Sequence, residues 1–225
     1  MMRIFEILFS SIALLILSPL LVPVILCLRF TGEREVFYRQ ERVGYKRKVF
    51  EVLKLATMVK NSPNLGAGTL TMKDDPRVLP LGRILRKTKI NEIPQLLNVF
   101  FGDMTIVGPR PLVPNGEKQY GVKNSKIIRS VKPGVTGIGS LVLKDEESYY
   151  AHRSDALDFY KDVISPYKFI LEKWYIERKT IGLDLKILIL TVLAVLKVDF
   201  NLWNFFPDLP KIPERMNNSL DQKDC

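Results

Sequence analysis

The chain has 225 residues, and its 34 lysines and arginines outnumber its 24 aspartates and glutamates, giving a net charge of +10. That excess suits an anionic partner such as a lipid headgroup, a phosphorylated substrate or a nucleic acid. A hydrophobic fraction of 47% argues against a polytopic membrane protein, and two cysteines and one histidine argue against a disulfide framework or a histidine-rich metal site.

An uncharged apolar run, Ile7–Leu28, opens the chain. As a straight helix it would extend about 33 Å, which is enough to cross the hydrocarbon core, and no cleavage site of a signal peptide follows it. Ser18 and Pro19 predict a break near its middle, because proline removes a helical hydrogen bond that a serine hydroxyl can replace. A spanning helix and a re-entrant helix that returns to the same face both stay open. Basic residues between Arg29 and Lys48 predict that the rest of the chain is cytoplasmic.

The next segments predict a compact α/β unit. Residues 36–58 favour extended structure, with a turn at Gly44 and a strand over Val49–Leu53. Residues 61–76 are typical of a loop. Helical spacing over Leu79–Lys89 predicts one helix, and Asn91 is expected to cap a second helix that ends at Gly102.

The second half of the chain favours helices. Residues 108–111 form a Gly-Pro-Arg-Pro turn, and helices are expected over residues 155–180 and 184–198. The latter helix and the aromatic residues after it suit a membrane interface, although a buried core helix fits the pattern nearly as well. The last dozen residues are polar and are expected to be disordered.

Charged residues near the helix pair suggest a diphosphate site. Arg86 and Arg110 could each hold phosphate oxygens through two parallel hydrogen bonds. Glu92 could hold a divalent metal ion that neutralises the same phosphates. These residue types alone do not identify the substrate.

A longer motif does point to a family. Residues 83–111, RILRKTKINEIPQLLNVFFGDMTIVGPRP, resemble the signature of the bacterial sugar transferases, the monotopic polyprenyl-phosphate phosphoglycosyl transferases. The resemblance covers nearly the whole chain. It also includes Ser18-Pro19 and residues 39–44, 54–58, 75–77, 131–137 and 184–187.

The resemblance implies a mostly helical α/β fold in a monotopic membrane protein. A membrane-embedded helix, re-entrant or spanning, would occupy residues 1–30. A small cytoplasmic α/β catalytic domain with interfacial amphipathic helices would occupy residues 31–206, and residues 207–225 would form a polar tail. The protein would lie at the inner membrane with its catalytic domain facing the cytoplasm.

The resemblance also implies a reaction. A UDP-sugar and polyprenyl (undecaprenyl) phosphate would give a polyprenyl-diphosphate sugar and UMP, with Mg²⁺, in the first membrane step of capsule, O-antigen, exopolysaccharide or glycoprotein glycan assembly. No nucleic-acid-binding motif is present. The identity of the sugar and the formation of a homodimer stay open.

The site residues follow by position from the family motif. Catalysis would fall to Asn91, Glu92 and Arg86, with Mg²⁺ at Asn91 and Glu92. The substrate would be bound by Lys54, Arg77, Arg110 and Asp184.

One departure from the family concerns the chemistry. The family carries an Asp-Glu pair whose Asp attacks the β-phosphate, whereas this chain has Asn91-Glu92, and a carboxamide has no anionic oxygen to attack phosphorus. Three interpretations stay open. Glu92 takes over the chemistry, as nucleophile or by directing the lipid phosphate; the chain is an impaired relative acting as a scaffold or regulator; or Asn91 is an altered residue in an otherwise active protein. Two milder departures are Ala56, where the family often has Arg, and Glu6, where it usually has Asp.

Overall fold

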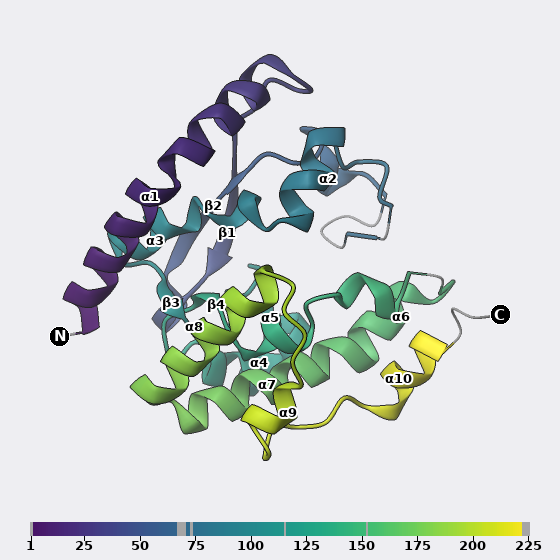
Figure 1. The fold of residues 1–225 in the computed structure, drawn as a ribbon. Coiled ribbons are helices and arrows are strands. Elements are labelled where there is room, and N and C mark those ends of the chain that lie inside the picture. The colour runs from purple at the N-terminus through teal and green to yellow at the C-terminus, as the bar shows by residue number, and fades with distance from the viewer. Residues whose placement is uncertain (1, 67–70, 73, 115, 152, 222–225) are drawn as a thin grey trace.

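The computed structural model describes residues 2–66, 71–72, 74–114, 116–151 and 153–221. Helices predominate in this part of the chain, as expected (Figure 1). The strands are β1 (Phe37–Val43), β2 (Val49–Leu55), β3 (Thr105–Val107) and β4 (Gly134–Thr136). The helices are α1 (Met2–Phe30), α2 (Pro80–Lys87), α3 (Gln95–Phe101), α4 (Gly116–Ile128), α5 (Ile138–Val142), α6 (Ala156–Phe159), α7 (Ser165–Arg178), α8 (Ile181–Val195), α9 (Leu202–Phe205) and α10 (Glu214–Asp221).

Two small sheets organise the first half of the domain. β1 and β2 form an antiparallel hairpin in which Phe37 faces Leu55, and its turn begins at Gly44, so the predicted strand and turn are confirmed. β3 and β4 pair in parallel. A Cβ atom on Gly134 would lie 2.0 Å from the backbone nitrogen of Gly108. Only glycine therefore lets the segment that follows β3 approach β4 this closely.

Two apolar clusters hold the molecule together. The larger cluster joins β3, α5, α7 and α8, and its fully buried members include Met104, Ile138 and Leu171. The smaller cluster joins α1, β2 and α2 through Leu28, Leu55 and Leu85. The C-terminal end of α1 is therefore part of the core of the domain rather than a free connection to it.

The helix α1 continues without interruption through Ser18 and Pro19, so the predicted break is absent from this structure. The Ser18 hydroxyl donates to the Leu15 carbonyl at 2.7 Å. That carbonyl is the one that would accept from the missing N–H of Pro19, so the side chain replaces the lost hydrogen bond. By length and composition alone, the helix is apolar and long enough to cross a membrane.

Figure 1 shows α1, in purple, along one side of the molecule next to α3. Near its N-terminus, Arg3 donates to the carbonyls of Val99 and Phe100 in the last turn of α3. Glu6 accepts a hydrogen bond from the hydroxyl of Thr105 on β3. Both ends of α1 therefore contact the same globular body.

The predicted helix start at Asn91 is wrong. Asn91 lies inside a short 3-10 turn, η3 (Ile90–Glu92), and α3 begins at Gln95 after Pro94, with no side-chain cap. Lys89 adopts a left-handed conformation with φ of 59°, which separates α2 from the turn η3. The end of α3 at Gly102 is as predicted.

The remaining helices agree with the sequence predictions in part. Residues 156–178 are helical throughout, with a π-helical turn η5 (Tyr160–Ile164) between α6 and α7, and α8 covers most of the range predicted for the next helix. The sequence did not predict α4, which is interrupted at Gly121 with φ of 76°. The predicted loop over residues 61–76 falls partly outside the described residues.

The C-terminal segment packs on the domain. Leu209 and Met216 are buried in the larger cluster, and α10 covers Glu214–Asp221. Disorder of the last dozen residues is therefore contradicted for 214–221, because two apolar side chains anchor an otherwise polar segment. The boundary predicted at residue 207 stays a prediction.

Candidate active site

Lys54 and Glu92 form the centre of the candidate site. Lys54 lies on β2 and Glu92 on the turn η3, and their Nζ and Oε1 atoms are 3.8 Å apart. Burial and the charges of three neighbouring guanidinium groups together lower the pKa of Lys54 to about 8, although the carboxylate of Glu92 opposes this shift. Burial disfavours the charged form of Glu92, but Lys54 and Arg110 outweigh burial and hold its pKa below the ordinary value. The pair is thus ionic and sits among cations.

Arg86 reaches the same region from α2. Its guanidinium donates to the Thr71 hydroxyl at 2.9 Å and lies 3.4 Å from the Glu147 carboxylate. Its charge favours ionised Glu92 and disfavours protonated Lys54. The close packing of α2 that places Arg86 depends on Gly82, whose Cβ would lie 2.1 Å from the carbonyl oxygen of Thr57.

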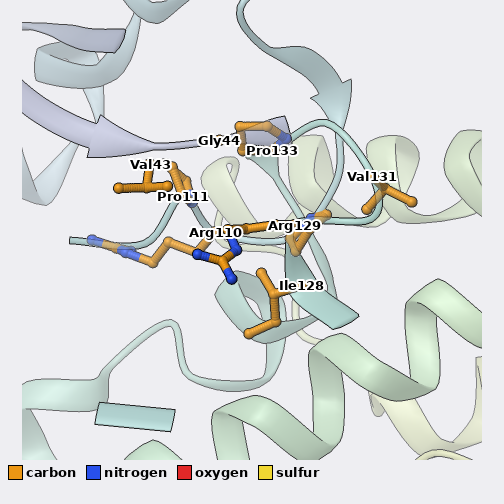
Figure 2. A pocket seen from close by; sticks show the side chains of 9 residues that line it. Val43, Gly44, Arg110, Pro111, Ile128, Arg129, Val131 and Pro133 are labelled. Atoms are coloured by element: carbon orange, nitrogen blue, oxygen red, sulfur yellow. The ribbon is translucent and has the colours of Figure 1, made fainter. Parts of the chain in front are cut away.

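Arg110 approaches from the turn after β3. The turn is tied to neighbouring segments by two backbone hydrogen bonds, from Gly108 N to Thr136 O and from Gly134 N to Pro109 O. The Arg110 side chain is exposed, and its charge acts on both Lys54 and Glu92. Arg110 also borders a narrow crevice that has no room for a ligand. Figure 2 shows Arg110 beside Ile128 and Arg129 in the lining of this crevice.

Arg42 is a site residue that the sequence analysis did not single out, although its motif was recognised. From β1 it donates to the Pro111 carbonyl at 3.2 Å and to the Gln40 side chain at 2.7 Å. Burial, followed by the charge of Arg110, lowers the pKa of Arg42 to about 10. Together with Lys54, Arg86 and Arg110, it makes the site strongly cationic and suited to a diphosphate.

The sequence analysis also missed an acidic segment on the other side of the site. In the turn η4 (Glu146–Tyr149), Glu147 contacts Arg86, and Glu146 pairs with Lys168 at 2.6 Å. Burial raises the pKa of Glu147 despite the charge of Arg86. The run Asp145-Glu146-Glu147 was visible in the sequence, but nothing local indicated which cations it would meet.

Asn91 lies beside Glu92 and is 7% exposed. Its Oδ1 atom has no hydrogen-bond partner among the described residues, which is unusual for a buried amide. Within the same described part, no group of three or more His, Cys, Asp or Glu side chains could hold a metal ion. One carboxylate and one free amide oxygen fit Mg²⁺, which usually takes its remaining ligands from substrate phosphates and water.

Two further residues predicted to bind substrate, Arg77 and Asp184, are bound by protein groups in this structure. The Arg77 guanidinium is buried and binds the Asp75 carboxylate at 2.6 Å and the carbonyls of Ser62 and Leu65. Asp184 accepts from the Tyr175 hydroxyl at 2.6 Å. The structure gives neither residue a contact with the Lys54–Glu92 pair within the described part, so their substrate-binding roles stay predictions.

Residues 1–198 match the bacterial sugar transferase family. This chain belongs to that family. The match spans α1, both sheets and α8, and it ends before α9 and α10. The expected family membership is therefore confirmed.

Curated relatives agree with the family. The chain is 34% identical to the exopolysaccharide production protein ExoY of Sinorhizobium fredii over 161 residues, covering 65% of this chain and 71% of that protein. It is 33% identical to UDP-glucose:undecaprenyl-phosphate glucose-1-phosphate transferase of Klebsiella pneumoniae, covering 84% of this chain but 39% of that protein. It is 30% identical to undecaprenyl-phosphate galactose phosphotransferase of Salmonella typhimurium, covering 88% and 40%.

Proposed function

We propose that this chain transfers a sugar-1-phosphate from a UDP-sugar to undecaprenyl phosphate and releases UMP. The observation that carries the proposal is the Lys54–Glu92 pair surrounded by Arg42, Arg86 and Arg110. Such a site can bind a diphosphate and stabilise the charge that develops during phosphoryl transfer. The Klebsiella and Salmonella relatives are named for this transfer, with different sugars.

The reaction needs no redox partner. An oxygen of the lipid phosphate forms a new bond to the β-phosphorus of the UDP-sugar. The bond from that phosphorus to the oxygen bridging the two phosphates breaks, and its electron pair leaves with UMP. Arg86 and Arg110 bind the phosphate oxygens, while Lys54 neutralises charge on the leaving group. Glu92, as the ionised carboxylate of the site, either directs this attack or first accepts the phosphosugar itself.

A magnesium ion bound by Glu92 and the Asn91 amide oxygen would neutralise phosphate charge when present. The unpartnered Oδ1 of Asn91 supports this assignment. Since an amide oxygen is neutral, the affinity for the metal would depend mainly on Glu92 and on the substrate phosphates.

The proposal places the protein at the inner membrane with its catalytic domain on the cytoplasmic face. The apolar face of α1 and an apolar face on α8 support membrane association. The basic residues between Arg29 and Lys48 support the cytoplasmic orientation. The exposed residues of the α8 face are Ile181, Leu185, Ile189, Val192 and Val195. A monotopic arrangement would let the site reach a lipid phosphate at the bilayer surface.

The direct test is UMP release by the full chain in detergent with undecaprenyl phosphate, Mg²⁺ and a panel of UDP-sugars. One or more sugars should give UMP and an organic-extractable sugar lipid, and Glu92→Gln should lower the rate by at least about 100-fold. Asp158→Asn, on an exposed surface, is the matched control. Turnover by Glu92→Gln at the unmodified rate would refute the role of Glu92.

The absence of an aspartate at position 91 is the one observation that favours a second candidate function, that of a membrane scaffold or regulator. An impaired relative that serves as a membrane scaffold or regulator would bind UDP through the same cations and would release no UMP with any sugar. Retention of the Lys54–Glu92 ion pair, with Arg86 and Arg110 close enough for their charges to act on Glu92, favours the active transferase instead.

A further inference from the structure

Glu172, on α7, is a buried carboxylate that the proposed reaction does not use. It is 5% exposed, and its Oε1 atom accepts a hydrogen bond from the backbone N–H of Arg110 at 3.3 Å. Its Oε2 atom has no hydrogen-bond partner in the described part of the chain. Burying such a group is costly, and a hydrophobic side chain would pack here at lower cost. Its contact with Arg110 offers a reason for the carboxylate.

The backbone around Arg110 offers few hydrogen-bond donors. Arg110 stands between Pro109 and Pro111, and a proline has no backbone N–H. The carbonyls of the two prolines accept from Gly134 and Arg42, respectively. Within the Pro-Arg-Pro segment, the N–H of Arg110 is therefore the single backbone donor. Its hydrogen bond is accepted by the carboxylate of Glu172.

The surrounding helix is shaped to admit this carboxylate. A Cβ atom on Gly139 in α5 would lie 2.7 Å from Oε1 of Glu172. Even alanine at this position would push the carboxylate away from the Arg110 N–H. Two elements far apart in sequence, α5 and α7, therefore cooperate to bring Glu172 against the turn.

The charged and titratable groups around Glu172 are Arg110 on the turn, Lys168 and Tyr175 on α7, and Tyr120 on α4. Burial raises the pKa of Glu172 to about 7, while the Arg110 N–H and the charges of Lys168 and Arg110 oppose it. We therefore expect the protonation state of this carboxyl group to change near neutral pH.

We propose that Glu172 is a positioning residue that holds the backbone of Arg110 so that its guanidinium meets the diphosphate of the nucleotide-sugar. This inference rests on the proposed function, since it assumes that Arg110 binds that diphosphate. Glu172 acts through the turn and does not touch the substrate. Its loss should therefore weaken diphosphate binding without removing the charge of Arg110.

The test measures binding of UDP with Mg²⁺ to the full chain in detergent by calorimetry. Glu172→Met keeps the length of the side chain and removes the acceptor, so the dissociation constant should rise about fivefold, as expected for one hydrogen bond. Glu172→Gln keeps an acceptor oxygen and should bind UDP within about twofold of the unmodified protein. Because glutamine does not titrate, the dissociation constant of this variant should lack the change near pH 7 that is expected for the unmodified protein.

A double-mutant cycle separates positioning from a general loss of stability. In an Arg110→Ala background, Glu172→Met should cause no further weakening, because the residue it positions is gone. Gly139→Ala displaces the carboxylate from a second element and should reproduce the fivefold effect, which keeps the test valid if Glu172→Met fails to fold.

Two results would overturn the inference in different ways. If the unmodified protein binds UDP and both Glu172→Met and Gly139→Ala bind it equally well, Glu172 does not position Arg110. Equal weakening by Glu172→Met with and without Arg110 would lead to the same conclusion. If the unmodified protein does not bind UDP at all, the proposed function fails and this inference fails with it.

Discussion

At residue 91 this chain has an asparagine, whose amide group replaces the carboxylate of an aspartate. This difference decides how the candidate site can react. Glu92 is ionised and paired with Lys54, whereas Asn91 is buried beside it with a free acceptor oxygen. The site therefore keeps its cations and one carboxylate but lacks the second anionic oxygen of the family pair. Metal binding and nucleophilic attack would both become easier with an aspartate there.

The first prediction restores that oxygen. Asn91→Asp should raise the rate of UMP release, or allow a phosphosugar adduct to accumulate, because an aspartate beside Mg²⁺ stays ionised and can attack phosphorus. Intact-mass spectrometry after brief exposure to a UDP-sugar would detect the adduct. The matched control is Asn91→Ala, which should retain turnover if Glu92 carries the chemistry. An inactive unmodified protein with an active Asn91→Asp would favour the scaffold or regulator instead.

A second residue-scale prediction concerns the buried Asp75–Arg77 pair. Hydrogen bonds from Arg77 lower the pKa of Asp75 to about 2 from an ordinary value of 3.8. Because the folded state holds the proton less tightly, this pair stabilises the protein above pH 4 and loses that contribution as the pH falls toward 2. Asp75→Asn should lower the free energy of unfolding by about 2 kcal/mol or more at pH 7.

Denaturant unfolding at pH 7 and at pH 2.5 measures that effect. The difference between Asp75→Asn and the unmodified protein should be smaller at the lower pH. Asp158→Asn, whose ion pair with Lys161 is long and exposed, should change stability by less than about 0.5 kcal/mol. A pH-independent deficit in Asp75→Asn would contradict the linkage.

At the scale of elements, the contact between α1 and α3 links the apolar helix to the candidate site. Arg3 donates to carbonyls at the C-terminal end of α3, where the helix dipole favours a positive charge. The N-terminal side of α3 continues directly from the turn that carries Asn91 and Glu92. A shift of α1 against the domain would therefore move the element that follows the site.

Removing the Arg3 side chain should weaken the contact between α1 and the C-terminal end of α3. Arg3→Ala is expected to lower the free energy of unfolding by about 1–2 kcal/mol, because two helix-terminal carbonyls lose a charged donor. Arg39→Ala, which breaks a 3.5 Å exposed ion pair with Glu51, is the control and should have little effect. Hydrogen exchange should show faster exchange in α3 for Arg3→Ala only. Unchanged exchange in α3 would mean that Arg3 does not stabilise its end.

At the scale of the whole molecule, the path of α1 bears on membrane topology. Arg3 contacts α3 near one end, and Leu28 packs with Leu55 and Leu85 near the other. A single globular body cannot hold both ends of a helix that places them on opposite sides of a bilayer. These contacts are the reason for proposing that the apolar face of α1 enters the membrane from one side.

The corresponding prediction is equal sidedness of the two helix ends. In a background with Cys27→Ser and Cys225→Ser, Met2→Cys and Arg34→Cys should react with a membrane-impermeant thiol reagent from the cytoplasmic side only. The measurement uses intact cells and inverted vesicles in parallel. Labelling of the two positions from opposite sides would establish a spanning helix and contradict the packing of α1 on the domain.

The sequence by itself determined the elements that depend on local chemistry. The family motif, the apolar run, the hairpin turn at Gly44 and the end of α3 at Gly102 were all readable, because glycine, proline and apolar periodicity act over a few residues. It also supplied the main charged residues of the site, since Lys54, Arg86, Glu92 and Arg110 lie within recognisable motifs.

Tertiary structure decided which of those side chains meet. Arg77 binds the nearby Asp75 and also the carbonyls of Ser62 and Leu65, and packing of the loop brings those two carbonyls within reach of the guanidinium. Arg42 and the buried Glu172 reach the Arg110 turn only because β1 and α7 pack against it. Packing also places both ends of α1 against the domain, through Arg3 and Leu28. Local sequence sets what each residue can do, and the long-range packing selects its partner.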